Sequence, residues 1–150
     1  MGQLDTSRQA GCPLCQDDGG ELVARAERLR VIRVADADYP GFYRVIWSDH
    51  AAELTDLQPS ERRALMDAVA TVEGLMRRHL QPIKINLASL GNMVPHLHWH
   101  LIARYPDDRH FPQPIWGEAQ RDGAIGAAHV SDEQLRRLDR EIAAAFQLLA

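Results

Sequence analysis

The chain has 150 residues, which is enough for a single domain with a real core over 1–150. Its formal net charge of -4 makes non-specific binding to nucleic acid unfavourable. No apolar run approaches the roughly 20 residues that cross a bilayer, which argues against a membrane partner. The polar start over 1–5 also lacks the core of a signal peptide, so we expect a cytoplasmic protein.

The first distinctive feature is the pair Cys12 and Cys15, in a polar stretch over residues 1–20 that we expect to be a loop. A reducing cytosol disfavours a structural disulfide between them. The thiols are therefore free, a redox pair or half of a metal site. The Cys-x-x-Cys spacing alone does not decide among these three readings.

Strands are expected next, because β-branched residues dominate 29–34 and 43–47. Between them, residues 36–41 end in Pro-Gly and supply the chemistry of a turn. This order of strand, turn and strand predicts an antiparallel hairpin.

Two helices are indicated by apolar residues repeated at three- and four-residue steps. Pro59 suits the first turn of one helix, and Ser131 with Gln134 forms a capping-box pattern at the start of the other. The two apolar stripes comprise Leu65, Val69, Val72, Met76 and Leu80 in the first helix, and Leu135, Leu138, Ile142, Phe146 and Leu149 in the second.

Two more strands are predicted between the helices, over 83–87 and roughly 96–104. A Pro-rich segment over 111–117 reads as an ordered loop, so that 106–150 forms a C-terminal loop and helix. Few βαβ units occur. The pattern therefore favours an α+β fold with a mostly antiparallel sheet of about five strands, a central helix and a C-terminal helix.

Three histidines alternate in the last of these strands. Because residues two apart in a strand share a face, His96, His98 and His100 should point one way. A neutral imidazole is a nucleophile, a protonated one donates to phosphate oxygens, and a neutral one also ligates metals. The alternative is a chance alternation of surface histidines. For the isolated histidines a structural or exposed role is preferred; these are His79, His110 and His129.

Residues 96–102, His-Leu-His-Trp-His-Leu-Ile, resemble the signature of the histidine-triad (HIT) family at all seven positions. Residues 50–57 resemble the family's approach to the central helix, and Asn86 with 91–92 resembles its substrate-side loop. The resemblance covers roughly residues 10–105. It implies a HIT-like fold, a nucleotide hydrolase or nucleotidyltransferase, and commonly a homodimer.

The resemblance also implies roles for single residues. His98 would attack the α-phosphate of a dinucleoside polyphosphate or nucleoside phosphoramidate, and water or another acceptor would discharge the nucleotidyl-histidine. His100 would bind the phosphate. Further substrate-side candidates are Asn86, Asn92 and Met93. Met93 stands where relatives often carry a hydroxyl residue, which leaves the preferred leaving group open.

Relatives hold the ribose hydroxyls with an acidic residue shortly before the second strand of the hairpin. Asp36 is the candidate for this role and Asp38 its neighbour, against the alternative that both only form the turn. Trp116 lies outside the resembling region. It either packs locally or reaches the active site of a neighbouring protomer.

A subset of the family, including the related uridylyltransferases, holds one structural zinc ion. Carried over, its ligands are Cys12, Cys15, His50 and His96, a closed Cys₂His₂ set. Such a site would pin the N-terminal loop to the catalytic strand. The alternatives remain free thiols or a redox pair and, for the whole protein, a zinc-stabilised nucleotide-binding module with little turnover.

Overall fold

The computed structural model describes residues 7–123 and 125–147. An antiparallel five-stranded sheet in the order β1-β2-β3-β5-β4 forms its centre. The strands are β1 (Glu21–Arg25), β2 (Leu29–Arg33), β3 (Phe42–Trp47), β4 (Lys84–Ala88) and β5 (His98–Arg104). The helices are α1 (Pro13–Gln16), α2 (Pro59–Leu80) and α3 (Asp132–Gln147), with 3-10 turns at Leu54–Asp56 and Ile125–His129. This confirms the predicted α+β architecture.

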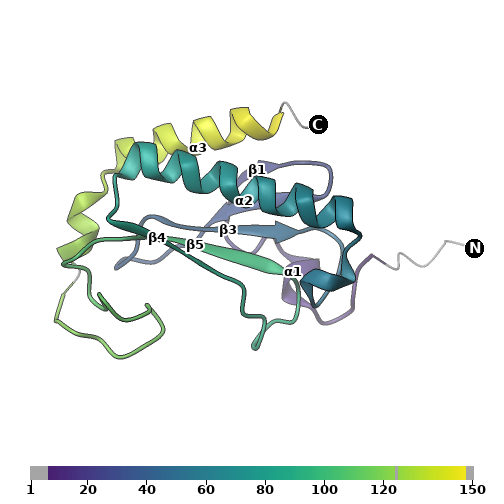
Figure 1. The fold of residues 1–150 in the computed structure, drawn as a ribbon, viewed down its shortest axis with the longest axis horizontal. Coiled ribbons are helices and arrows are strands. Elements are labelled where there is room, and N and C mark those ends of the chain that lie inside the picture. Colours follow the sequence, from purple (N-terminus) through teal and green to yellow (C-terminus); the bar gives the residue numbers. More distant parts are fainter. Residues whose placement is uncertain (1–6, 124, 148–150) are drawn as a thin grey trace, which may run out of the picture.

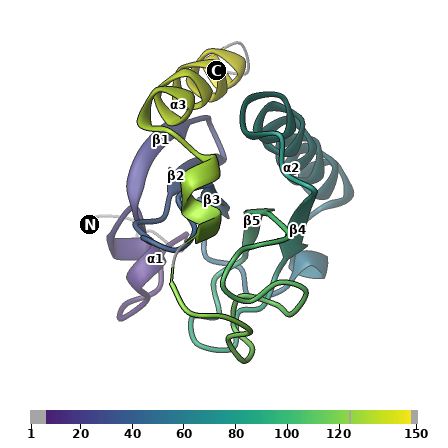
Figure 2. The same cartoon turned by 90° about the vertical axis from the view of Figure 1, so that its left-hand side faces the viewer.

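The two long helices, α2 and α3, lie along the same face of the sheet (Figures 1 and 2). Both apolar stripes are buried as predicted, except that Leu149 lies outside the described residues. The predicted capping box of α3 also forms, with the backbone N–H of Ser131 donating to Gln134 Oε1 (2.8 Å) and that of Gln134 donating to Ser131 Oγ (3.1 Å).

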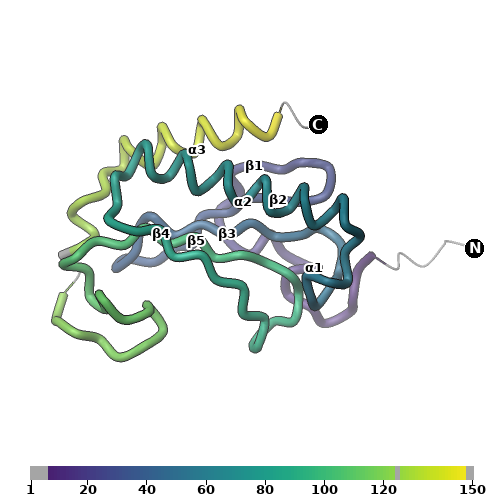
Figure 3. Tube along the Cα trace, in the orientation of Figure 1, coloured from purple at the N-terminus to yellow at the C-terminus, as the bar shows by residue number. Residues whose placement is uncertain are grey.

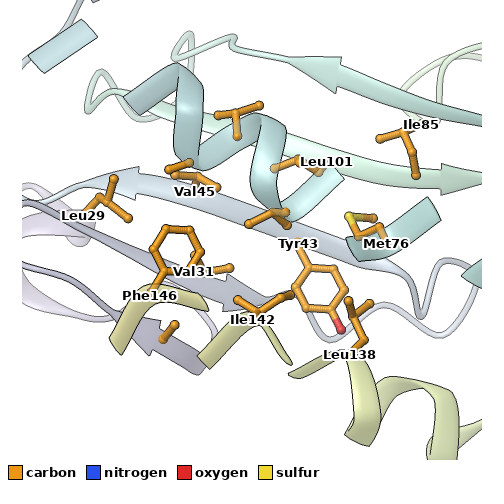
Figure 4. Close-up of a cluster of buried hydrophobic side chains, with 14 of the residues drawn as sticks. Leu29, Val31, Tyr43, Val45, Met76, Ile85, Leu101, Leu138, Ile142 and Phe146 are labelled. Atoms are coloured by element: carbon orange, nitrogen blue, oxygen red, sulfur yellow. The ribbon is translucent and has the colours of Figure 1, made fainter. Parts of the chain in front are cut away.

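The main core fills the space between the sheet and these helices (Figure 4). Every second residue of a strand faces the helices, so Tyr43 and Val45 of β3 belong to the same buried cluster as Leu138 and Ile142 of α3. Tyr43 also donates from its hydroxyl to Asp139 (2.6 Å), which ties the sheet to α3.

The opposite face of the sheet carries the candidate chemistry and is covered by irregular chain. Figure 3 shows the N-terminal segment and the loops that follow β4 and β5 on this side, away from α2 and α3. Leu14 of α1 packs on Ile32 and Ile46, while Ile115 packs beside Phe42 and Ile102. The sheet is thereby buried on both faces around a gap at the histidines.

Two local boundaries differ from the sequence-based expectation. Strand β5 begins at His98, because the backbone N–H of His96 donates to the carbonyl of Val94 (2.8 Å) and so places His96 in a turn. The short helix α1 replaces the expected loop around Cys15, with Pro13 at its first position. Within the residues described, no helix has the length and apolar character of a membrane span.

Candidate active site and metal centre

His98 and His100 line a cavity of about 490 Å³ on the loop-covered face of the sheet. Strand β5 lies between β3 and β4, and the register places Arg44 of β3 directly opposite His100. The loop after β4 contributes Asn92 and the highly exposed Met93 to the wall. Residues from five separate segments of the described chain therefore meet at this cavity.

The hydrogen bond of His98 settles which of its ring nitrogens carries the proton. Nδ1 lies 2.5 Å from the backbone carbonyl oxygen of His96, and a carbonyl can only accept. Nδ1 is thus the donor, and Nε2 of the neutral ring keeps its lone pair. Burial lowers the pKa of His98, the hydrogen bond to His96 opposes that shift, and the charge of Arg44 adds to it. The ring is therefore neutral near pH 7, with the lone pair of Nε2 free.

His100 has the opposite arrangement. Nε of Arg44 lies 3.3 Å from Nδ1 of His100 and donates to it, because guanidinium has no acceptor. The proton of the neutral ring is then on Nε2. Burial, followed by the charges of His98 and Arg44, lowers the pKa of His100 to about 3. The two rings, 4.8 Å apart between centroids, therefore present one lone pair and one N–H donor.

A second cluster lies beside the first, and it contains all four residues of the expected metal set. Nδ1 of His96 is 3.4 Å from both Cys12 Sγ and Cys15 Sγ, and Nδ1 of His50 is 3.5 Å from Cys15 Sγ. In tetrahedral zinc, bonds of about 2.3 Å to sulfur and 2.0–2.1 Å to nitrogen separate these ligand atoms by about 3.6 Å. The cluster therefore has the spacing to hold a metal ion such as zinc.

The surroundings of the cluster also suit a metal. Nε2 of His96 lies 2.6 Å from the carbonyl oxygen of Trp47, so Nε2 carries the proton and Nδ1 faces the sulfurs with its lone pair. The Cys15 sulfur accepts from the backbone N–H of Gln9 (3.4 Å). Buried Arg30 of β2, which the sequence did not single out, donates to the carbonyls of three residues around α1 and fixes that segment to the sheet: Leu14, Asp17 and Asp18.

Two candidate substrate residues make structural hydrogen bonds. Asp36 Oδ1 accepts from the backbone N–H groups of Asp38 (3.0 Å) and Tyr39 (3.3 Å), which is the geometry of an Asx turn. Asn86 Oδ1 accepts from Nη1 of Arg104 (2.7 Å). Neither residue lines the cavity of His98, and contacts of theirs to a substrate stay predictions.

Trp116 and Arg44 complete the cavity. The indole of Trp116 meets the His100 ring edge-on, with centroids 5.0 Å apart, inside the same chain. Its loop is held by Arg104, which donates to the carbonyl of Gln113 (2.7 Å) and to Asp108 (2.7 Å from Nε). The sequence alone leaves the place of Trp116 open and contains no signal that singles out Arg44.

Residues 18–107 match the HIT domain family. An AP-4-A phosphorylase from Mycobacterium tuberculosis is 28% identical over 111 residues, which cover 70% of this chain and 57% of that protein. The chain thus spans little more than half the length of this curated relative.

Solved structures show the same fold. A histidine triad protein from Bradyrhizobium japonicum superposes with a TM-score of 0.68 at 27% identity, covering 83% of this chain and 92% of that one. Another from Marinobacter aquaeolei has a TM-score of 0.68 at 23% identity, covering 89% and 93%. With the family match extending over more than half of its residues, this chain belongs to the HIT domain family.

Proposed function

We propose that the chain is a nucleotide-conjugate hydrolase that forms a covalent nucleotidyl intermediate on His98. The observation that carries this proposal is the bond from His98 Nδ1 to the His96 carbonyl, which leaves the Nε2 lone pair available at a cavity. An imidazole that is neutral, buried and fixed in one tautomer is a suitable nucleophile at neutral pH.

In the first step, the Nε2 lone pair of His98 forms a bond to the α-phosphorus of a dinucleoside polyphosphate. The bond from that phosphorus to the bridging oxygen breaks, and the leaving phosphate chain takes the electron pair. His96 accepts the Nδ1–H hydrogen bond throughout, which stabilises the positive charge that develops on the ring. In the second step water attacks phosphorus, Nε2 leaves with the electron pair of its bond, and the water's proton passes to solvent.

His100 would donate from Nε2–H to a phosphate oxygen in both steps. The backbone N–H groups around Asn92 and Met93 lie on the wall of the same cavity and would add donors. Fixed donors of this kind stabilise the charge that builds on the equatorial oxygens without reorganising in the transition state.

We further propose that Cys12, Cys15, His50 and His96 bind one structural zinc ion. The observations that support it are the S···N spacings of 3.4–3.5 Å and the Trp47 carbonyl that orients His96. All four protein ligands would be filled, so the ion would hold the N-terminal segment and take no part in the chemistry.

A second candidate is nucleotidyl transfer to an acceptor other than water. The name of the Mycobacterium tuberculosis relative, AP-4-A phosphorylase, favours phosphate as that acceptor. The same first step serves both reactions. They differ only in what discharges the intermediate, and for diadenosine tetraphosphate the products would be AMP from water or ADP from phosphate.

The test is intact-protein mass spectrometry after rapid mixing with diadenosine tetraphosphate or adenosine phosphoramidate. We expect an adenylyl adduct and nucleotide products in the wild type and in His129→Ala, and neither in His98→Ala. His129 is a matched control because it lies outside the cavity, paired with Asp107 on the surface. Repeating the reaction with added phosphate distinguishes AMP from ADP as the product. Nucleotide binding with no adduct and no products would overturn the proposal in favour of a binding module.

A further inference from the structure

Arg44 occupies an unusual position on β3. Its half-buried guanidinium borders the cavity, with Nε 3.3 Å from Nδ1 of His100 and its central carbon 5.5 Å from the centroid of the Phe42 ring. Across residues 7–123 and 125–147, no carboxylate forms an ion pair with it. Even half-buried, a cation without an anionic partner is costly, so the group calls for a specific role.

We propose that Arg44 is a positioning residue that holds His100 in the Nε2–H tautomer and provides the positive charge of the phosphate site. The statement about the His100 tautomer depends only on the hydrogen bond between Arg44 and His100. The statement about the phosphate site rests on the proposed function, because it requires an anion at this cavity.

The tautomer follows from the chemistry of the pair. A neutral imidazole in solution exchanges between two tautomers, and only one of them leaves Nδ1 free to accept from Arg44. In the other tautomer two N–H groups would face each other at 3.3 Å, and the Nε2 lone pair would repel a phosphate oxygen. Arg44 thus does for His100 what the His96 carbonyl does for His98, with the opposite result.

The charge argument comes from the rest of the cavity. Among the residues that line the cavity, Arg44 alone carries a permanent formal charge. A phosphate held only by neutral donors would keep its full charge uncompensated in a partly buried site. Arg44 offsets this charge from behind His100, through the hydrogen bond to that ring.

The experiment reads the tautomer directly, by ¹⁵N NMR of protein labelled at histidine, with the His100 signals assigned by their loss in His100→Gln. We expect Nε2–H in the wild type, a mixture of tautomers in Arg44→Met, and a return toward Nε2–H in Arg44→Lys, which keeps a charge and an N–H donor. AMP affinity, measured by calorimetry, should fall about 10- to 100-fold in Arg44→Met and recover in part in Arg44→Lys.

Arg63→Met is the matched control, because Arg63 is exposed on α2 and does not line this cavity. It should leave both readouts unchanged. An Nδ1–H tautomer of His100 in the wild type would overturn the proposal whether or not any variant folds. So would an unchanged tautomer together with unchanged AMP affinity in Arg44→Met. Neither readout needs turnover, so a failure of covalent catalysis on His98 would remain distinguishable.

Discussion

The carbonyl oxygen of His96 lies 2.5 Å from Nδ1 of His98, while the His96 imidazole belongs to the Cys₂His₂ cluster. One residue therefore connects the two clusters, with its side chain in the Cys₂His₂ cluster and its backbone carbonyl holding the His98 ring. The turn that places it is fixed by its own N–H bond to Val94 and by the Nε2 bond to Trp47. A change in the Cys₂His₂ cluster should therefore affect His98 through this turn.

The first prediction concerns the metal. Cys15→Ser removes a buried thiol from the Cys₂His₂ cluster, and we expect it to lose zinc binding and about 4 kcal/mol or more of unfolding free energy. Formation of the His98 adduct should slow as well, because the His96 turn loses its anchor. Zinc content by atomic absorption, urea denaturation and adduct mass check the three effects.

The control for this prediction is His129→Gln, which removes an exposed histidine outside the cluster and should retain one zinc per chain. A Cys15→Ser protein that still holds a full equivalent of zinc would contradict the assignment. Reversible disulfide formation in a metal-free wild type would instead support a redox pair.

The second prediction is a pH dependence of stability that originates in His100. Burial first, then the charges of His98 and Arg44, lower its folded-state pKa from 6.5 to about 3. Between pH 7.5 and 5.5 only the unfolded chain binds a proton at this residue, so acidification favours unfolding. The wild type should lose about 1.4 kcal/mol more than His100→Gln over this interval.

Urea denaturation at the two pH values, with equal zinc loading, measures this difference. All other residues are the same in both proteins, so the difference between the two losses reports on His100. Equal losses in wild type and His100→Gln would mean that His100 takes up its proton in the folded state near pH 6.5.

Much of the fold was predictable because the signals are local. The helical stripes, the capping box at Ser131 and the alternation around His98 and His100 depend on neighbours within a few residues, and the structure confirms them. The start of β5 was predicted two residues early. The reason is that His96 lies in a turn, where its backbone N–H donates to the carbonyl of Val94. The backbone N–H of the next residue, Leu97, donates to the carbonyl of Ala51, which follows β3.

The contacts that the sequence could not predict depend on which strands become neighbours in the sheet. Arg44 and His100 are 56 residues apart and meet only because β5 inserts between β3 and β4. Before that pairing is known, Arg44 is simply a polar residue in a strand. Asp36 is a different case, because the local sequence was compatible both with a turn and with a contact to ribose. The structure shows the turn. The predicted homodimer stays a prediction.

The third prediction tests the loop that carries Trp116. Burial alone would raise the pKa of Asp108, but hydrogen bonds from Arg104 and from backbone N–H groups lower it, so the buried carboxylate is charged. Arg104→Met leaves that charge without its partner, and we expect a loss of about 3–5 kcal/mol in unfolding free energy. Arg137→Met breaks an exposed pair with Glu133 and should cost less than about 1 kcal/mol. Similar losses in both variants would argue against the anchoring role.

The last prediction separates binding from stability at Trp116 itself. The indole is 51% exposed and meets His100 edge-on, so Trp116→Ala removes little buried surface. We expect less than about 1 kcal/mol of destabilisation. Because the ring forms one wall of the cavity, KM for diadenosine tetraphosphate should rise about tenfold, with a smaller change in kcat.

Leu22→Ala provides the comparison, since Leu22 is also an exposed apolar residue, 43% accessible on β1, and does not line the cavity. It should match Trp116→Ala in stability and the wild type in KM. A large destabilisation of Trp116→Ala with unchanged KM would assign the ring to packing of the 111–117 loop. The opposite pattern places a ligand contact at this wall, next to the ring that Arg44 holds, and makes the C-terminal loop of the same chain part of the substrate site.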